Sequence, residues 1–165
     1  MVNQQYCGSW WVAPIPEHRR HNMQVLVAYE SRGGRTRRAA EAVAVAVRAQ
    51  GSEATVKALK DTTAEDVERS EAIAIGTWVE GFVFFKVGPA KAALAGVGRL
   101  PALAGKRAAV FCTYGFNPGA TLATLRRSLE DKGATVVAEN ASPRSHPDRG
   151  AVELAERICA SPGES

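Results

Sequence analysis

Short apolar runs alternate along this chain with segments whose apolar residues recur at intervals of three and four. The apolar runs are residues 25–29, 54–59, 72–77, 108–113 and 135–138. Runs this short and rich in β-branched residues are typical of strands buried on both faces of a parallel sheet. The intervening helical spacing predicts helices over residues 39–47, 61–69, 89–96, 122–129 and 152–159, and residues 140–149, with two prolines, are predicted to form a polar loop. The alternation therefore predicts an α/β domain with five parallel strands and helices on both faces of the sheet.

The loop between the first predicted strand and the first predicted helix is rich in hydroxyl groups, glycine and arginine. The first amide groups of a helix have no partner within the helix, and the helix dipole is positive at that end. A loop of this composition before a helix is therefore typical of phosphate binding. The spacing matches neither the P-loop nor the dinucleotide-binding glycine motif. We predict a phosphate-binding loop made of Ser31, Arg32, Gly33, Gly34, Arg35 and Thr36.

The same stretch resembles the signature of the flavodoxins. The matching residues are Val27, Tyr29, Ser31, Gly34, Thr36, Ala40 and Val43. One position departs from the signature, because Ala28 is smaller than the residue that is usual there. The alternative to the resemblance is that this stretch is a βα turn of some other α/β domain. The resemblance extends over residues 23–160 and is closest to the short-chain type, because no insertion interrupts the fifth strand. It implies a flavodoxin-like doubly wound sheet with strand order 2-1-3-4-5.

The resemblance also implies FMN as the cofactor and adds two loops to the site. Trp78, after the third strand, is expected to cover one face of the isoalloxazine ring. Tyr114, after the fourth strand, is the second aromatic and lies where backbone groups reach the ring edge. Such stacking disfavours the anionic reduced flavin and lowers its reduction potential. Ordinary core packing of both aromatics is the alternative. The residues implied are Thr77, Trp78, Val79, Glu80 and Gly81 in the first of these loops, and Thr113, Tyr114, Gly115 and Phe116 in the second.

Two features depart from the flavodoxin pattern. Arg32 and Arg35 flank the phosphate loop, where flavodoxins use neutral groups; they either add charge-assisted hydrogen bonds or stay solvated. The surplus of acidic residues that docks basic redox partners is missing. Phe82, Phe84 and Phe85 instead offer an apolar group near the proposed ring edge. We expect these phenylalanines to form the buried start of the third helix. The alternatives are a contact for a quinone-sized substrate and a dimer patch.

Composition narrows the class of protein. The chain has 165 residues, 45% of them apolar and 23% charged, as in one globular domain. Lys and Arg total 21 against 17 Asp and Glu, but no basic stripe forms, so nucleic acid is not an expected partner. No apolar run approaches the ~20 residues of a membrane span, and no signal peptide is visible, so we expect a cytoplasmic protein. Three dispersed cysteines predict free thiols.

Both ends of the chain are expected to lie outside the domain. Residues 1–22 have no hydrophobic period and are predicted to form a flexible extension. Residues 161–165 are predicted to form a disordered tail, which leaves residues 23–160 as the domain. His18 and His21 lie in the extension without supporting residues, so no metal site is predicted.

Two functions fit this reading of the sequence. The first is an FMN-binding redox protein that passes electrons to a partner protein or reduces a small quinone-like acceptor. Neither reaction needs a protein nucleophile, and no catalytic residue is predicted. The second is a flavodoxin-like fold without cofactor that acts as an interaction module. A response-regulator receiver shares the topology, but Glu30 is a poor substitute for the acidic pair it needs. The sequence indicates neither the oligomeric state nor the electron donor.

Overall fold

A computed structural model of the chain describes residues 22–82 and 85–161. The predicted extension and tail therefore lie outside the described residues, except for Asn22 and Ser161. The elements, in chain order, are β1 (Gln24–Tyr29), α1 (Arg35–Ala49), β2 (Glu53–Ala58), the 3-10 turn η1 (Leu59–Asp61), α2 (Ala64–Arg69), β3 (Ala72–Phe82), β4 (Phe85–Pro89), α3 (Lys91–Arg99), β5 (Arg107–Tyr114), α4 (Thr121–Glu130), β6 (Thr135–Pro143) and α5 (Ala151–Cys159).

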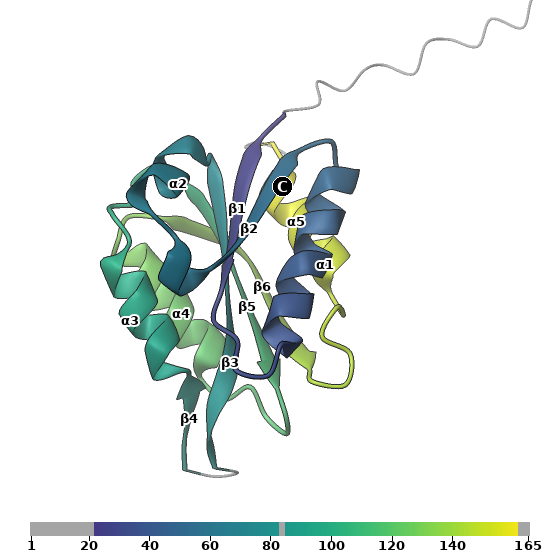
Figure 1. Cartoon of the computed structure of the whole chain (residues 1–165), viewed down its shortest axis with the longest axis vertical. Coiled ribbons are helices and arrows are strands. Elements are labelled where there is room, and N and C mark those ends of the chain that lie inside the picture. The colour runs from purple at the N-terminus through teal and green to yellow at the C-terminus, as the bar shows by residue number, and fades with distance from the viewer. Residues whose placement is uncertain (1–21, 83–84, 162–165) are drawn as a thin grey trace, which may run out of the picture.

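Five of the strands form a parallel sheet in the order β2-β1-β3-β5-β6. Counted without β4, this is the predicted order 2-1-3-4-5, so the doubly wound α/β fold is confirmed. Helices cover both faces of the sheet, with α1 and α5 on one side and α2, α3 and α4 on the other (Figure 1). The strand order reverses beside β1, which leaves a crevice beyond the carboxyl ends of β1 and β3.

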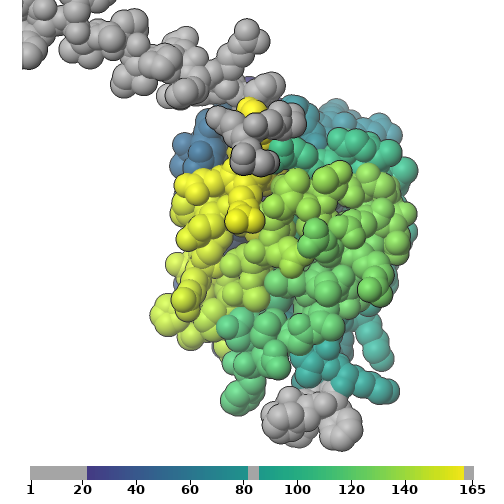
Figure 2. All heavy atoms as spheres, turned by 180° about the vertical axis from the view of Figure 1, so that it is seen from behind, coloured from purple at the N-terminus to yellow at the C-terminus, as the bar shows by residue number. Residues whose placement is uncertain are grey.

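The pattern of side chains along β1 explains the two helical layers. Val25 and Val27 pack into the hydrophobic core under α1 and α5, whereas Leu26 and Ala28 pack into the core under α2, α3 and α4. All four are at most 2% exposed. Successive residues of a strand point to opposite faces, so an uninterrupted apolar run is needed where both faces are covered. Figure 2 shows the opposite view, in which α5 is yellow and the segment around α4 and β6 is green.

A hairpin replaces the predicted start of the third helix. We predicted a helix from Pro89 to about residue 96, but Pro89 is the last residue of β4, and α3 begins at Lys91. β4 pairs antiparallel with β3 only, so it is an edge strand, where a residue without an N–H group is tolerated. Phe85 belongs to β4 and does not begin a helix. The side chains of residues 82–85, with the apolar group predicted there, lie outside the described residues.

The last strand is longer than predicted. Residues 140–149 were expected to form a polar loop, but residues 140–143 continue β6. They pair in register with the end of β5, from Phe111 opposite Asn140 to Tyr114 opposite Pro143. Asn140 Nδ2 and Ser142 Oγ each donate to the Arg149 carbonyl oxygen at 2.7 Å. Polar side chains therefore belong to this strand because they close the turn that follows it.

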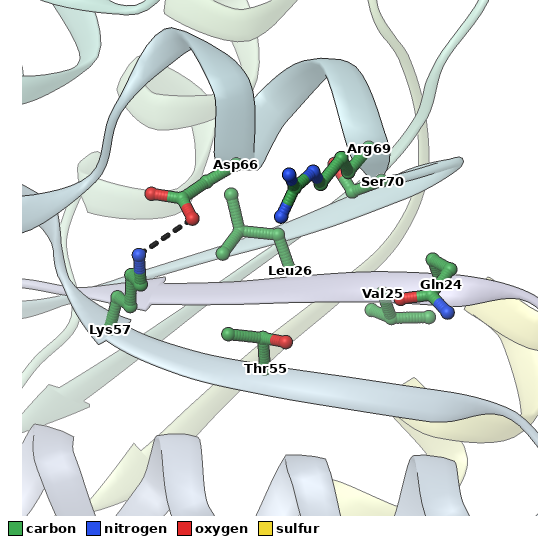
Figure 3. A pocket seen from close by; sticks show the side chains of 8 residues that line it. All are labelled: Gln24, Val25, Leu26, Thr55, Lys57, Asp66, Arg69 and Ser70. Carbon is green, nitrogen blue, oxygen red and sulfur yellow. Dashed lines mark hydrogen bonds and ion pairs between the residues drawn. The ribbon is translucent and has the colours of Figure 1, made fainter.

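An ion pair joins β2 to α2 beside a cavity of about 260 Å³ (Figure 3). The Nζ of Lys57 lies 2.6 Å from one carboxylate oxygen of Asp66. The other oxygen accepts from the Thr63 amide at 2.8 Å, which completes a capping box at the start of α2. The hydrogen bond from Lys57, followed by that from the Thr63 amide, lowers the pKa of Asp66 from its ordinary 3.8 to about 2.

Replacing Asp66 with asparagine is expected to destabilise the fold by about 1 kcal/mol at neutral pH, since the partly exposed ion pair with Lys57 is lost and the capping oxygen no longer carries a charge. Because the pKa of Asp66 is lower in the folded than in the unfolded protein, its ionised carboxylate stabilises the fold at pH values above the unfolded-state pKa. This contribution disappears as the pH falls toward 2. Melting temperatures of both proteins between pH 7 and pH 2 check this. Glu65→Gln, which removes the other acidic charge of the first turn and an exposed pair with Arg69 but leaves the capping box intact, is the control. An equally large difference at pH 2 would contradict the assignment to charge.

Candidate functional site

A cavity of about 450 Å³ opens beyond the carboxyl ends of β1, β3 and β5. Its lining comes from the three segments that the sequence singled out and from one further residue. The residues that line it are Ser31, Arg32, Gly33, Arg35, Thr36, Trp78, Val79, Thr113 and Arg144. The tertiary structure therefore brings the phosphate-loop sequence together with the ends of β3 and β5.

The phosphate-loop sequence ends in an uncapped helix N-terminus. Gly34 is the residue before α1 and has φ +78°, a conformation that residues with a side chain rarely adopt. It offers no side chain to accept from the first amides of α1, and the first turn holds no acidic residue. The Ser31 hydroxyl is buried and has no hydrogen-bond partner among the described residues. This end of the cavity therefore presents hydrogen-bond donors and the positive end of a helix dipole.

A buried hydrogen bond joins the phosphate loop to the end of β5. The hydroxyl oxygens of Thr36 and Thr113 lie 2.8 Å apart. The two residues are 1% and 4% exposed, so neither hydroxyl has ready access to water as an alternative partner. A buried hydroxyl without a partner is costly, so this bond fixes where α1 begins relative to β5.

Trp78 forms an aromatic wall of the cavity. It is half-buried, and the guanidinium carbon of Arg32 lies 5.9 Å from the centre of its ring. Thr77, the residue before Trp78, is fully buried and does not line the cavity; its hydroxyl donates to the Trp78 carbonyl oxygen at 3.0 Å. Trp78 packs only in part against the core and leaves part of its surface to the cavity.

Several predicted site residues are not among those that line the cavity. The carboxylate of Glu80 accepts from the Lys91 amide at 3.0 Å and so caps α3, whose preceding residue offers no side-chain cap. Gly81 lies in the irregular part of the β3–β4 pairing and has φ +131°. Tyr114 is half-buried and pairs with Pro143. Phe116 is 87% exposed.

Arg144 is a lining residue that the sequence did not indicate. It follows β6 directly, and its amide donates to the Tyr114 carbonyl oxygen at 2.8 Å. Its guanidinium lies against Gly115, where an added Cβ would be 2.5 Å from Nη2. The residue fell inside the predicted polar loop, so no sequence pattern placed it beside the end of β5.

The charges around the cavity are positive. Among the described residues, those that line it include Arg32, Arg35 and Arg144 and no acidic side chain. Arg37, on the first turn of α1, is paired with Glu41 at 2.9 Å. Cys112, the buried residue before Thr113, has the pKa of its thiol raised to about 12 by burial, so it stays protonated. The arrangement suits an anionic ligand and offers no thiolate nucleophile.

Residues 22–82 and 85–161 provide neither a metal site nor a membrane-spanning helix. These residues contain no cluster of three or more His, Cys, Asp or Glu side chains that would hold a metal ion. No helix among them combines the length and the apolar character that crossing a membrane requires.

Comparison with known proteins agrees with this architecture. A family model described as a flavodoxin domain matches residues 26–143. A search of curated proteins found no match. Among solved structures, the two-electron reduced flavodoxin of Megasphaera elsdenii is 23% identical, with a TM-score of 0.67 over 83% of this chain and 99% of that one.

Other flavodoxins give similar values. The flavodoxin of Streptococcus pneumonia TIGR4 is 18% identical, with a TM-score of 0.66 over 82% of this chain and 97% of that chain. A short-chain flavodoxin associated with a bacterial microcompartment is 15% identical, with a TM-score of 0.65 over 82% of this chain and 99% of that one. At these identities the solved structures establish a common fold.

Proposed function

Because this chain belongs to the flavodoxin domain family, whose members bind FMN and transfer electrons, we propose that its cavity holds FMN between the phosphate loop and Trp78. The observation that carries the proposal is the uncapped start of α1 beside a buried, unpartnered Ser31 hydroxyl. A terminal phosphate supplies the acceptors that both groups lack. FMN supplies the capacity to take up and release electrons, which the protein side chains do not have.

The phosphate end of the cavity fits a dianion. The first amides of α1 and the hydroxyls of Ser31 and Thr36 supply neutral donors, and Arg32 and Arg35 add positive charge. The left-handed Gly34 leaves open space where a side chain would otherwise stand, since a Cβ there meets nothing within 4 Å. These residues would bind and orient the phosphate without any chemical change in the protein.

The ring end of the cavity fits a flat apolar group. The exposed part of Trp78 offers a stacking face, and the neighbouring Val79 also lines the cavity. The guanidinium of Arg32 lies over the Trp78 ring in the structure, and a stacked isoalloxazine would have to displace it. The protein would therefore exclude water from one face of the ring and leave the rim accessible for electron transfer.

The first experiment is to identify the ligand. Protein purified without added flavin, or after incubation with FMN, is expected to show flavin absorption, and mass spectrometry of the released ligand should give the mass of FMN. A protein that folds but neither retains nor binds FMN would instead favour the interaction module without cofactor.

The acceptor that we propose is a small quinone-like molecule, which would make the protein an oxidoreductase. The support is the charge balance, because 21 Lys and Arg against 17 Asp and Glu leave no surplus of acidic groups for docking a basic partner protein. Among the described residues, the site itself also lacks acidic groups for such docking, since its charged lining residues are arginines. The apolar contact that the phenylalanines of residues 82–85 would offer to a quinone does not support the proposal, because their side chains lie outside the described part of the structure.

Oxidation of the photoreduced protein by an uncharged soluble quinone is expected to change less than about twofold in rate between low and moderate salt, since no charge steers a neutral acceptor. Stopped-flow measurements with the quinone and, in parallel, with an acidic redox protein check this. Negligible reaction with the quinone beside fast, salt-dependent transfer to the protein would identify an electron carrier that has an acidic partner.

A further inference from the structure

Arg144 lines the cavity beside Tyr114 and Gly115, two residues that the resemblance to the flavodoxins assigns to the ring edge. Its backbone amide is bonded to Tyr114, and the turn that follows it is closed by Asn140 and Ser142, which both donate to the Arg149 carbonyl oxygen. Its guanidinium packs against Gly115 so closely that a Cβ there would lie 2.5 Å from Nη2, 3.0 Å from the guanidinium carbon and 3.1 Å from Nε. Gly115 thus leaves room for the guanidinium between the ends of β5 and β6.

The charge of Arg144 is not neutralised by a neighbour. The ion pairs of the described residues engage Arg37, Arg69 and Arg126, but not Arg144. Among the described residues that line the cavity, no acidic side chain opposes it. The phosphate loop has two arginines of its own, Arg32 and Arg35, which also line the cavity, so the phosphate does not require Arg144.

We propose that Arg144 raises the reduction potential of the bound flavin by stabilising its anionic reduced form. The proposal rests on the function proposed above and concerns one residue of the same site. Reduction by two electrons with uptake of one proton leaves a single negative charge on the isoalloxazine, and a nearby guanidinium favours the charged form. Stacking on Trp78 would lower the reduction potential, so the potential of the bound flavin would reflect the balance between Trp78 and Arg144.

The role differs from that of a phosphate ligand. A residue that binds the phosphate changes the affinity for FMN and leaves the affinity for riboflavin unchanged. A residue that acts on the ring shifts the potential of the protein loaded with either flavin. Comparing both flavins therefore separates the two roles in a single variant.

The test is an equilibrium reductive titration against a reference dye of wild type, Arg144→Gln, Arg144→Lys and Arg127→Gln, each loaded with FMN and, separately, with riboflavin. Arg127→Gln removes the same charge from an exposed position of α4 outside the cavity. Arg144→Gln is expected to lower the potential of the one-electron couple that forms the anion by about 59 mV, a tenfold change in its equilibrium. Arg144→Lys should restore most of this, and Arg127→Gln should match wild type.

Salt gives an independent readout. The difference between wild type and Arg144→Gln should shrink as the salt concentration rises, because the guanidinium is exposed and its field is screened. Equal potentials in FMN-loaded wild type and Arg144→Gln would overturn the proposal and leave FMN binding intact. An equal fall in Arg127→Gln would overturn it as well, since the effect would then follow net charge. Failure of wild type to bind FMN would overturn both this proposal and the proposed function.

Discussion

FMN is expected to bind the folded protein at least a hundredfold more tightly than riboflavin, a difference of about 3 kcal/mol or more. The two ligands share the ring and the ribityl chain, so the difference reports on the phosphate alone. The phosphate would accept hydrogen bonds from the first amides of α1 and from the Ser31 hydroxyl, which is buried without a partner in the described residues. Fluorescence titration of the ligand-free protein with each flavin measures both dissociation constants.

Thr36→Ala should reduce this preference more than Arg35→Ala. Thr36 is buried, lines the cavity and is bonded to Thr113, whereas Arg35 is exposed. Alanine at position 36 also leaves the Thr113 hydroxyl without a partner, which costs about 1–3 kcal/mol of stability. Thr36→Ser keeps the hydroxyl and should retain most of the affinity, so it separates the hydroxyl from the methyl group.

Two outcomes would contradict this view of the phosphate end. Equal affinities for FMN and riboflavin would mean that the loop does not bind the phosphate. A larger loss in Arg35→Ala than in Thr36→Ala would mean that the guanidinium groups, rather than the amides and hydroxyls, hold it.

Gly76→Ala is expected to destabilise the fold by about 2–3 kcal/mol, because it overpacks the centre of the sheet. Gly76 lies on β3 opposite Phe111 of β5, and a Cβ there would be 2.1 Å from two ring carbons of Phe111. The ring is only 1% exposed, so it has no solvent space into which to move. Denaturant unfolding of the variant, monitored by circular dichroism, measures the loss.

A second substitution tests the cause. Phe111→Leu in the Gly76→Ala background should recover part of the lost stability, since the smaller side chain makes room for the new methyl group. Gly98→Ala is the control, because a Cβ at this exposed position of α3 meets nothing within 4 Å. It should stabilise the protein by roughly 0.5–1 kcal/mol through helix propensity. A Gly76→Ala protein as stable as wild type would show that the core adjusts to the added methyl group.

Local patterns predicted the parallel sheet and the phosphate loop, and the resemblance to the flavodoxins implied the strand order. Apolar runs buried on both faces, such as residues 25–29, have few alternatives to a central parallel strand, and right-handed crossovers leave few topologies. The end of the first strand and the start of α1 are neighbours in the chain. The glycine between them, Gly34, is therefore recognisable before the fold is known.

The tertiary structure alone decided which residues meet from distant parts of the chain. The hydrogen bond between Thr36 and Thr113 joins residues 77 positions apart. Glu80 caps α3 only because the unpredicted β3–β4 hairpin brings the two together. Arg144 reaches the cavity because β6 continues beside β5 to Pro143, although the polar residues of this segment read as a loop. Such contacts depend on strand register and on where a strand ends. Where the end of a strand is polar, the pattern of hydrophobic positions determines neither its register nor its last residue.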